Sequence, residues 1–133
     1  DQAAERISDV DDDWPWGNAF RRTPHYIDAQ RATCYGRLGL ANQSAELWGH
    51  VINQQPRGYR RDQGVYLARH ARALVDAGEP SAAVRPASQA VACLHDTGSA
   101  RMRLELARLA DKATSWTHTS AGRDLNDALV DVH

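Results

Sequence analysis

The sequence predicts an all-α protein built from antiparallel helical hairpins. Apolar residues recur at the three- and four-residue spacings of a buried helix face, whereas no run alternates apolar and polar residues as a strand would. Glycine and proline interrupt these runs where helices end and begin. A small-residue frame also returns at a fixed interval, which is typical of stacked hairpins, so we expect roughly five to seven helices in a single domain over residues 1–133.

The first two helices are expected between residues 24 and 56. Thr23 and Pro24 form an N-cap followed by proline at the first helical position. Gly39 follows the run and can take the left-handed conformation that ends a helix, and Pro56 ends the second helix. The residues expected on the buried faces of this pair are Ile27, Cys34, Leu38, Trp48, Val51 and Ile52.

The next pair is delimited by Gly78, which ends one helix, and Pro80, which begins the other. Pro86 lies about a turn and a half into the second helix and lacks a backbone donor, so it is expected to kink that helix or delay its start. The residues expected on the two buried faces are Leu67, Ala71, Leu74 and Val75, then Ala83, Ala87, Ala90, Val91 and Leu94. Of the larger side chains, we expect Trp48, Leu74 and Leu94 to be buried between helices.

A further helix and a short final one complete the expected order. The residues that mark the buried face of the first are Met102, Leu106 and Leu109. Trp116 is expected to pack on the last hairpin, and residues 117–133 are predicted to form a C-terminal capping helix with Thr119 or Ser120 as its N-cap. The apolar positions of that last helix are Leu125, Leu129 and Val132.

At the other end, residues 1–13 are predicted to be either the remains of a truncated helix or an acidic lead-in that contains Asp11, Asp12 and Asp13. The first residue is Asp1 and not methionine, so we expect the chain to be a fragment of a longer protein. Cys34 and Cys93 both lie in alanine-rich, helical surroundings, which favours reduced, buried thiols in a cytoplasmic protein.

Several classes of chemistry find no support in the sequence. The net charge of −1 gives no general attraction to nucleic acid or to an anionic membrane, and no apolar run approaches the length of a membrane span. The six histidines are scattered, so no metal pair is indicated, and glycine-rich phosphate loops and nucleophile motifs are missing. We therefore predict a protein that is not an enzyme and that holds no metal or cofactor.

The repeat has an interval of 39 residues. Its small-residue frame begins at Ala29, Ala68 and Ala107, and the turn glycines Gly39 and Gly78 keep the same interval. The second hairpin resembles the tetratricopeptide (TPR) pattern of large, small, large, turn glycine, small and small residues at Leu67, Ala71, Leu74, Gly78, Ala83 and Ala90. The interval exceeds the usual repeat of about 34 residues because the link over residues 56–64 is long, and the first hairpin has Ser44 where alanine is usual. The resemblance implies hairpins stacked as a TPR-like right-handed superhelix.

A closer resemblance covers roughly residues 14–130. The segments RATCYGRLG (31–39), PRGYRRDQGVYLARHARALVDAGEP (56–80) and TGSARMRLELARLADKATSW (97–116) resemble the C-terminal TPR-like region of actinobacterial helix-turn-helix transcriptional regulators. That resemblance implies a cytoplasmic regulatory domain that senses a ligand or partner or mediates dimerisation. DNA would be met only through a separate domain that this chain does not contain. The alternative is a free-standing TPR scaffold or adaptor that binds peptides or other proteins.

The resemblance also implies where binding occurs, because the first helix of each TPR hairpin lines the concave face. The residues that this register places in the groove are Tyr26, Gln30, Thr33, Arg37, Arg69, Arg72, Asp76 and Arg108. Arginines in such a groove can hold a carboxylate or phosphate in bidentate fashion, so a peptide, protein or small-molecule effector is expected there. The alternative is that these arginines form a solvated face or pair with nearby aspartates. Neither Arg69 nor Arg72 falls on a buried stripe, so replacing either is expected to weaken binding and leave stability nearly unchanged.

Overall fold

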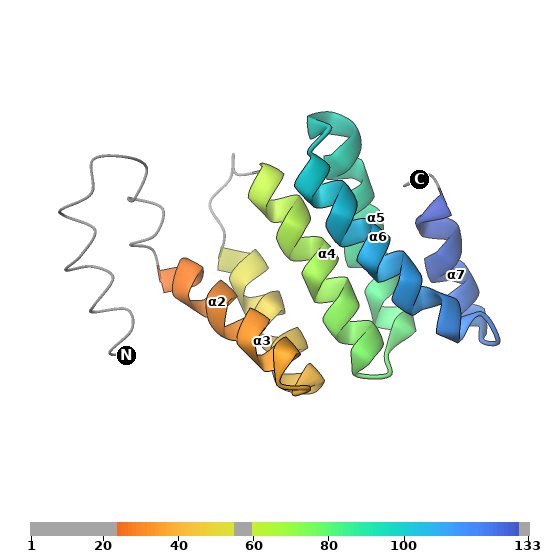
Figure 1. Ribbon diagram of the computed structural model, residues 1–133, viewed down its shortest axis with the longest axis horizontal. Helices are drawn as coiled ribbons and strands as arrows, with labels where there is room; N and C mark the ends of the chain where they lie inside the picture. The colour runs from red at the N-terminus through yellow and green to blue at the C-terminus, as the bar shows by residue number, and fades with distance from the viewer. Residues whose placement is uncertain (1–23, 55–59, 131–133) are drawn as a thin grey trace.

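The computed structural model describes residues 24–54 and 60–130, and every regular element in these two ranges is helical (Figure 1). The elements are α2 (Pro24–Arg37), α3 (Ala41–Gln54), α4 (Arg60–Asp76), α5 (Pro80–Thr97), α6 (Ala100–Ala113), a 3-10 turn η1 (Thr114–Trp116) and α7 (Ser120–Ala128). The prediction of an all-α protein is confirmed. Thr23, Pro56, Val132 and the lead-in over residues 1–13 lie outside the described residues.

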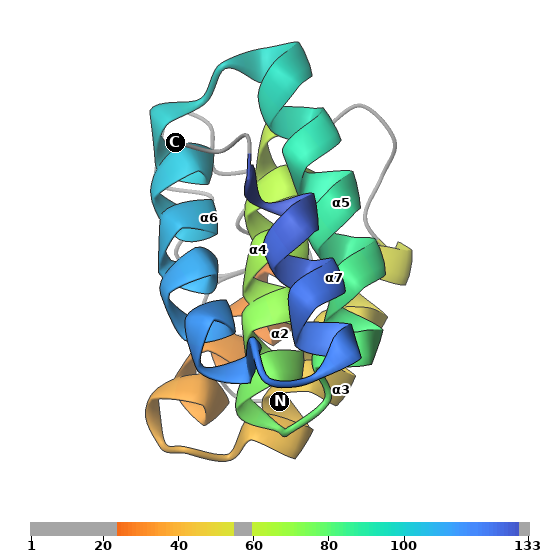
Figure 2. The same cartoon turned by 90° about the vertical axis from the view of Figure 1, so that its right-hand side faces the viewer.

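Helix α4 occupies the middle of the arrangement. It packs against α5, its partner in a tight hairpin, and also against α3 on one side and α6 on the other. The α2/α3 hairpin lies at one end of the row, and α7 lies along α5 at the opposite end (Figures 1 and 2). Helices α2, α4 and α6, the first members of successive pairs, therefore lie toward one side of the row.

Glycines end the helices where the sequence predicts. Gly39 and Gly78 have φ angles of 77° and 81°, in the left-handed region where a Cβ atom is unfavourable. After each helix the chain closes with paired backbone hydrogen bonds, from Gly78 N to Val75 O (3.0 Å) and from Glu79 N to Leu74 O (2.8 Å) in the second hairpin. Helix α5 then starts at Pro80, as expected.

Of the two effects expected of Pro86, a kink in α5 or a delayed start, the delayed start is wrong. The helix begins at Pro80 and runs through Pro86 to Thr97, and the Pro86 ring is buried. A proline at this position removes a single hydrogen bond, to the carbonyl four residues earlier, while burial of its ring contributes apolar contact. Packing of α5 on α4 and α7 therefore outweighs the local cost of Pro86.

Alanine dominates the contacts between helices. Trp48, Leu74 and Leu94 are buried, as predicted, and they lie in one continuous core with fully buried alanines on α2, α4, α5 and α6. The alanines with no exposed surface are Ala32, Ala71, Ala83, Ala87, Ala90 and Ala113. Small side chains let helix backbones approach closely, and this close approach is what the repeating alanine frame provides.

The predicted burial of Cys34 and Leu38 is wrong. Cys34 is exposed and Leu38 is 72% exposed, whereas Cys93 is buried as expected. The side of α2 that packs on α3 is marked by Ala32, whose carbonyl accepts a hydrogen bond from the buried Ser44 hydroxyl (2.8 Å). Cys34 is two residues farther on, which places it about 200° around the helix from Ala32. Leu38 lies beyond the last residue of α2, in the turn.

The C-terminal end has the predicted short helix, and α7 covers Ser120–Ala128 of the predicted range 117–133. Trp116 is half-buried against the core, and Thr119 is the N-cap of α7, accepting a hydrogen bond from Gly122 N (2.9 Å). Leu125 and Leu129 are buried. None of the helices within residues 24–54 and 60–130 has the length and apolar character needed to cross a membrane.

Candidate functional site

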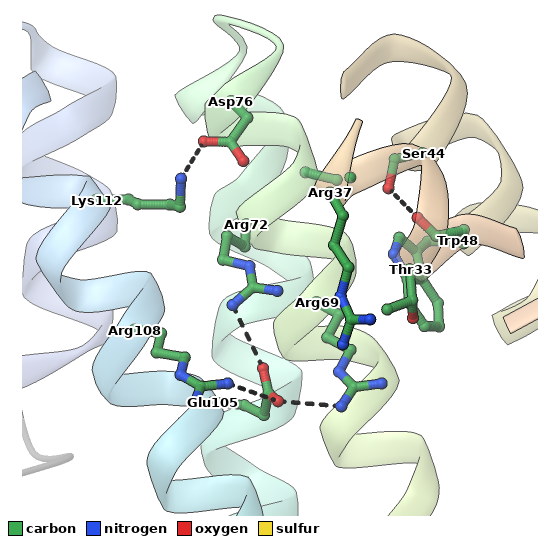
Figure 3. A pocket seen from close by; sticks show the side chains of 13 residues that line it. Thr33, Arg37, Ser44, Trp48, Arg69, Arg72, Asp76, Glu105, Arg108 and Lys112 are labelled. Carbon is green, nitrogen blue, oxygen red and sulfur yellow. Dashed lines mark hydrogen bonds and ion pairs between the residues drawn. The ribbon is translucent and has the colours of Figure 1, made fainter. Parts of the chain in front are cut away.

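A pocket of about 240 Å³ opens between α2, α4 and α6, with α3 behind it (Figure 3). Helix α2 contributes Ala32, Thr33, Gly36 and Arg37, and α3 contributes Ser44 and Trp48. Helices α4 and α6 form the other side of the pocket, facing α2, and none of the lining residues belongs to α5 or α7. Helices α2, α4 and α6 thus share one concave site.

Positive charge is concentrated in this pocket. Its cationic lining residues are Arg37, Arg69, Arg72, Arg108 and Lys112, and its anionic ones are Asp76 and Glu105. Five cations against two carboxylates leave an excess of three positive charges, although the whole chain has a net charge of −1. The pocket is therefore an electropositive site on a nearly neutral protein, and it attracts anions.

Glu105 lies at the centre of the arginines. Its side chain is 5% exposed, and its Oε1 accepts a hydrogen bond from Arg69 Nη2 at 3.1 Å. Two more guanidinium groups approach it, Arg108 with Nη1 at 3.6 Å from Oε1 and Arg72 with Nη1 at 3.7 Å from Oε2. Glu105 Oε2 is buried and accepts no hydrogen bond from the described part of the chain. One carboxylate is thus surrounded by three arginines and forms a hydrogen bond with one of them.

Arg37 approaches from the other side of the pocket. Its side chain extends from α2 toward the space beside Arg69 and Thr33 (Figure 3). No carboxylate within the described ranges pairs with it. The other charged pair of the pocket is internally neutral, since Lys112 Nζ donates to Asp76 Oδ1 at 2.7 Å. The positive excess therefore belongs to the guanidinium groups.

The polar and aromatic wall behind the arginines is held by its own contacts. Thr33 Oγ1 donates to the Ala29 carbonyl (2.9 Å), and the buried Trp48 ring packs on Tyr66 with ring centroids 5.2 Å apart. Burial and, to a smaller extent, Asp62 raise the pKa of Tyr66, so this phenol stays protonated. The charge of the site is therefore carried by its arginines, its lysine and its two carboxylates.

Six of the eight predicted groove residues lie together in the pocket: Thr33, Arg37, Arg69, Arg72, Asp76 and Arg108. The structure does not place Tyr26 or Gln30 there, and Gln30 is exposed. All four predicted residues of α2 share one helix face, but the pocket opens at the C-terminal part of that face. Tyr26 and Gln30 precede this part and lie outside the pocket.

The sequence-based prediction missed Glu105, Lys112, Ser44 and Trp48, of which Glu105 matters most. A pattern in the sequence could have identified it. Met102, Glu105, Leu106 and Leu109 follow the i, i+3, i+4, i+7 spacing of one helix face, so Glu105 lies on the same stripe as three buried apolar residues. A carboxylate on a buried stripe requires cationic partners, which the neighbouring helices supply.

Comparisons with known proteins add no further identification. A scan against protein-family models, a search of curated proteins and a search of solved structures each found no match. Within the described ranges, no group of three or more histidine, cysteine, aspartate or glutamate side chains is arranged to hold a metal ion. The chemistry that the pocket itself supports is the binding of an anion by convergent guanidinium groups.

Proposed function

We propose that this chain is a non-enzymatic binding module whose pocket receives an acidic group of a ligand or partner. The observation that carries the proposal is the excess of three positive charges in a concave site between three helices. Guanidinium groups bind carboxylates and phosphates through pairs of parallel hydrogen bonds, and such charge-assisted bonds are stronger than neutral ones. Arg37, which has no carboxylate partner in the described part of the chain, is the side chain most available for this contact.

The setting that we propose is the ligand- or partner-sensing domain of a cytoplasmic transcriptional regulator, able to form a homodimer and reaching DNA through a separate domain. The resemblance of residues 14–130 to the C-terminal TPR-like region of actinobacterial helix-turn-helix regulators supports this setting. In this proposal the hairpins stack as a TPR-like right-handed superhelix, which is supported by the contribution of α2, α4 and α6 to one pocket. A free-standing scaffold would use the same pocket. The gene sequence upstream of the codon for Asp1 would distinguish the regulator from the scaffold, since a helix-turn-helix signature there favours the regulator.

Anion binding can be tested by thermal unfolding without knowledge of the ligand. Replacing chloride by acetate, citrate or phosphate at constant ionic strength is expected to raise the thermal midpoint by a few degrees for the anion that fits, because a ligand of the folded state stabilises it. Raising the ionic strength is expected to reduce this gain through screening. In Arg37→Gln the anion-dependent rise of the thermal midpoint is expected to disappear, while the midpoint in chloride stays near that of the wild-type protein.

The matched control is Arg85→Gln. Arg85 is exposed on α5, which contributes nothing to the pocket, so this variant loses the same charge elsewhere on the surface. It is expected to keep the full anion-dependent gain. A gain that falls equally in both variants, or the absence of a gain for every anion, contradicts the proposed function.

A further inference from the structure

Glu105 neutralises only part of the charge that surrounds it. Arg69, Arg72 and Arg108 all lie within 3.7 Å of its two oxygens, so this group of four side chains has two positive charges in excess. Arg37 adds a third from α2. Like charges held together in a partly enclosed site repel one another, and their repulsion is relieved when an anion of matching charge enters.

The arginines also have hydrogen-bond donors to spare. Each guanidinium group carries five N–H donors, and the bond from Arg69 to Glu105 is the one hydrogen bond between the arginines and this carboxylate. Arg72 and Arg108 lie at 3.7 and 3.6 Å from the oxygens of Glu105, too far for a good hydrogen bond. Their attraction to Glu105 holds them in place and leaves most of their donors available to a ligand.

These cations come from three different helices. Arg37 is on α2, Arg72 on α4 and Arg108 on α6, so a group between them is approached from three directions (Figure 3). A carboxylate is planar, has two oxygens and brings one negative charge. A phosphoryl group has three terminal oxygens arranged around phosphorus and brings a charge of about −1.5 to −2 at pH 7. The phosphoryl group therefore suits donors that approach from three directions, and its charge offsets more of the excess of three positive charges than a carboxylate does.

We infer that the pocket selects the doubly charged phosphoryl group of a phosphomonoester, or free phosphate, over a carboxylate or another singly charged anion. This inference rests on the proposed function and specifies its acidic group. Glu105 acts in it as a fixed internal counter-ion, which keeps Arg69, Arg72 and Arg108 close together while the pocket is empty. Trp48 and Thr33 form the wall beside Arg37 that the remainder of the ligand meets.

The test compares three probes that differ only in their head group: phenyl phosphate, phenyl sulfate and benzoate. Phenyl sulfate keeps the tetrahedral shape and has a single charge, whereas benzoate has a planar carboxylate. By isothermal titration at pH 7.5 and constant ionic strength, phenyl phosphate is expected to bind at least roughly tenfold more tightly than either. Inorganic phosphate, titrated in parallel, shows whether the pocket recognises free phosphate or requires a phosphate ester. The inference holds with either result, provided that phenyl sulfate and benzoate bind more weakly than phenyl phosphate.

Variants locate the binding. Arg37→Gln and Arg108→Gln are each expected to weaken phenyl phosphate binding by roughly tenfold to a hundredfold, the effect of losing hydrogen bonds to a charged group. Arg85→Gln is expected to leave it unchanged. Circular dichroism of each variant checks that the helices are retained.

The outcomes separate the inference from the proposed function. Equal affinity for the three phenyl probes, lost in Arg37→Gln, overturns the phosphoryl inference and leaves an anion-binding module. No binding of any probe at concentrations up to about 10 mM overturns both, because a fitted site should reach millimolar affinity for its head group. If Arg85→Gln weakens phenyl phosphate binding as much as Arg37→Gln does, the assignment of binding to this pocket is overturned.

Discussion

Replacing Arg69 by alanine is expected to lower the free energy of unfolding by about 2–4 kcal/mol. The sequence places this arginine off the buried stripe and predicts little change in stability, whereas its contacts in the structure lead us to expect a larger loss. The Arg69 side chain is 17% exposed and donates the one hydrogen bond that it shares with Glu105, which is 5% exposed. Removing the donor leaves a buried carboxylate with only the longer contacts to Arg72 and Arg108.

The Glu105→Gln background provides the control for this variant. Glutamine keeps the shape of the side chain without its charge, so Arg69→Ala should cost clearly less there than in the unchanged protein. Urea denaturation followed by circular dichroism measures all four corners of this double-mutant cycle. An equal loss in both backgrounds would show that Arg69 stabilises the fold by packing alone, and the buried ion pair would then have no energetic role.

Replacing Gly122 by alanine is expected to destabilise the protein by about 3 kcal/mol or more, or to detach α7 from α5. Gly122 is buried in the first turn of α7, where its N–H donates to the Thr119 cap. A Cβ atom there would overlap the backbone carbonyl of Trp116 and would lie 2.6 Å from the Cβ of Trp116. Because backbone atoms cannot move aside by a change of rotamer, the turn that joins α6 to α7 must shift.

The same substitution at Gly49 is the matched control. Gly49 lies inside α3, and an added Cβ would meet the ring of His70 at 3.7 Å, an ordinary van der Waals distance. Alanine should therefore stabilise α3 by about 0.5–1 kcal/mol, since glycine is the poorer helix former. Thermal and urea unfolding of the two variants should give changes of opposite sign. A Gly122→Ala protein as stable as the unchanged one would mean that α7 does not pack on the Trp116 turn as described.

Local chemistry made most of the fold predictable. Gly39 and Gly78 need the left-handed conformation, and Pro80 and Thr119 fit helix starts, so the ends of the helices follow from single residues. The wrong assignments depend on packing. Cys34 is apolar and at helical spacing from Ile27, yet the side of α2 that meets α3 is set by Ala32 and its contact with Ser44.

The site was predictable to the extent that it follows the repeat. Arg69 and Arg108 occupy matching places in successive frames, so the register places both on one wall. Where along α2 the pocket opens depends on how the hairpins stack, and this arrangement leaves Tyr26 and Gln30 outside. The partnership of Arg69 with Glu105 joins residues on different helices 36 positions apart, and spacing along one helix cannot reveal it.

The central claim is that the arginines of the pocket between α2, α4 and α6 bind an anionic group. It is tested most directly by observing those side chains in the wild-type protein. Nuclear magnetic resonance of the arginine Nε–Hε groups during a titration with phenyl phosphate reports each guanidinium separately. We expect saturable shifts for Arg37, Arg72 and Arg108, with Arg85 and Arg123, which lie outside the pocket, unchanged. Shifts spread evenly over the arginines, or confined to those outside the pocket, would contradict the claim.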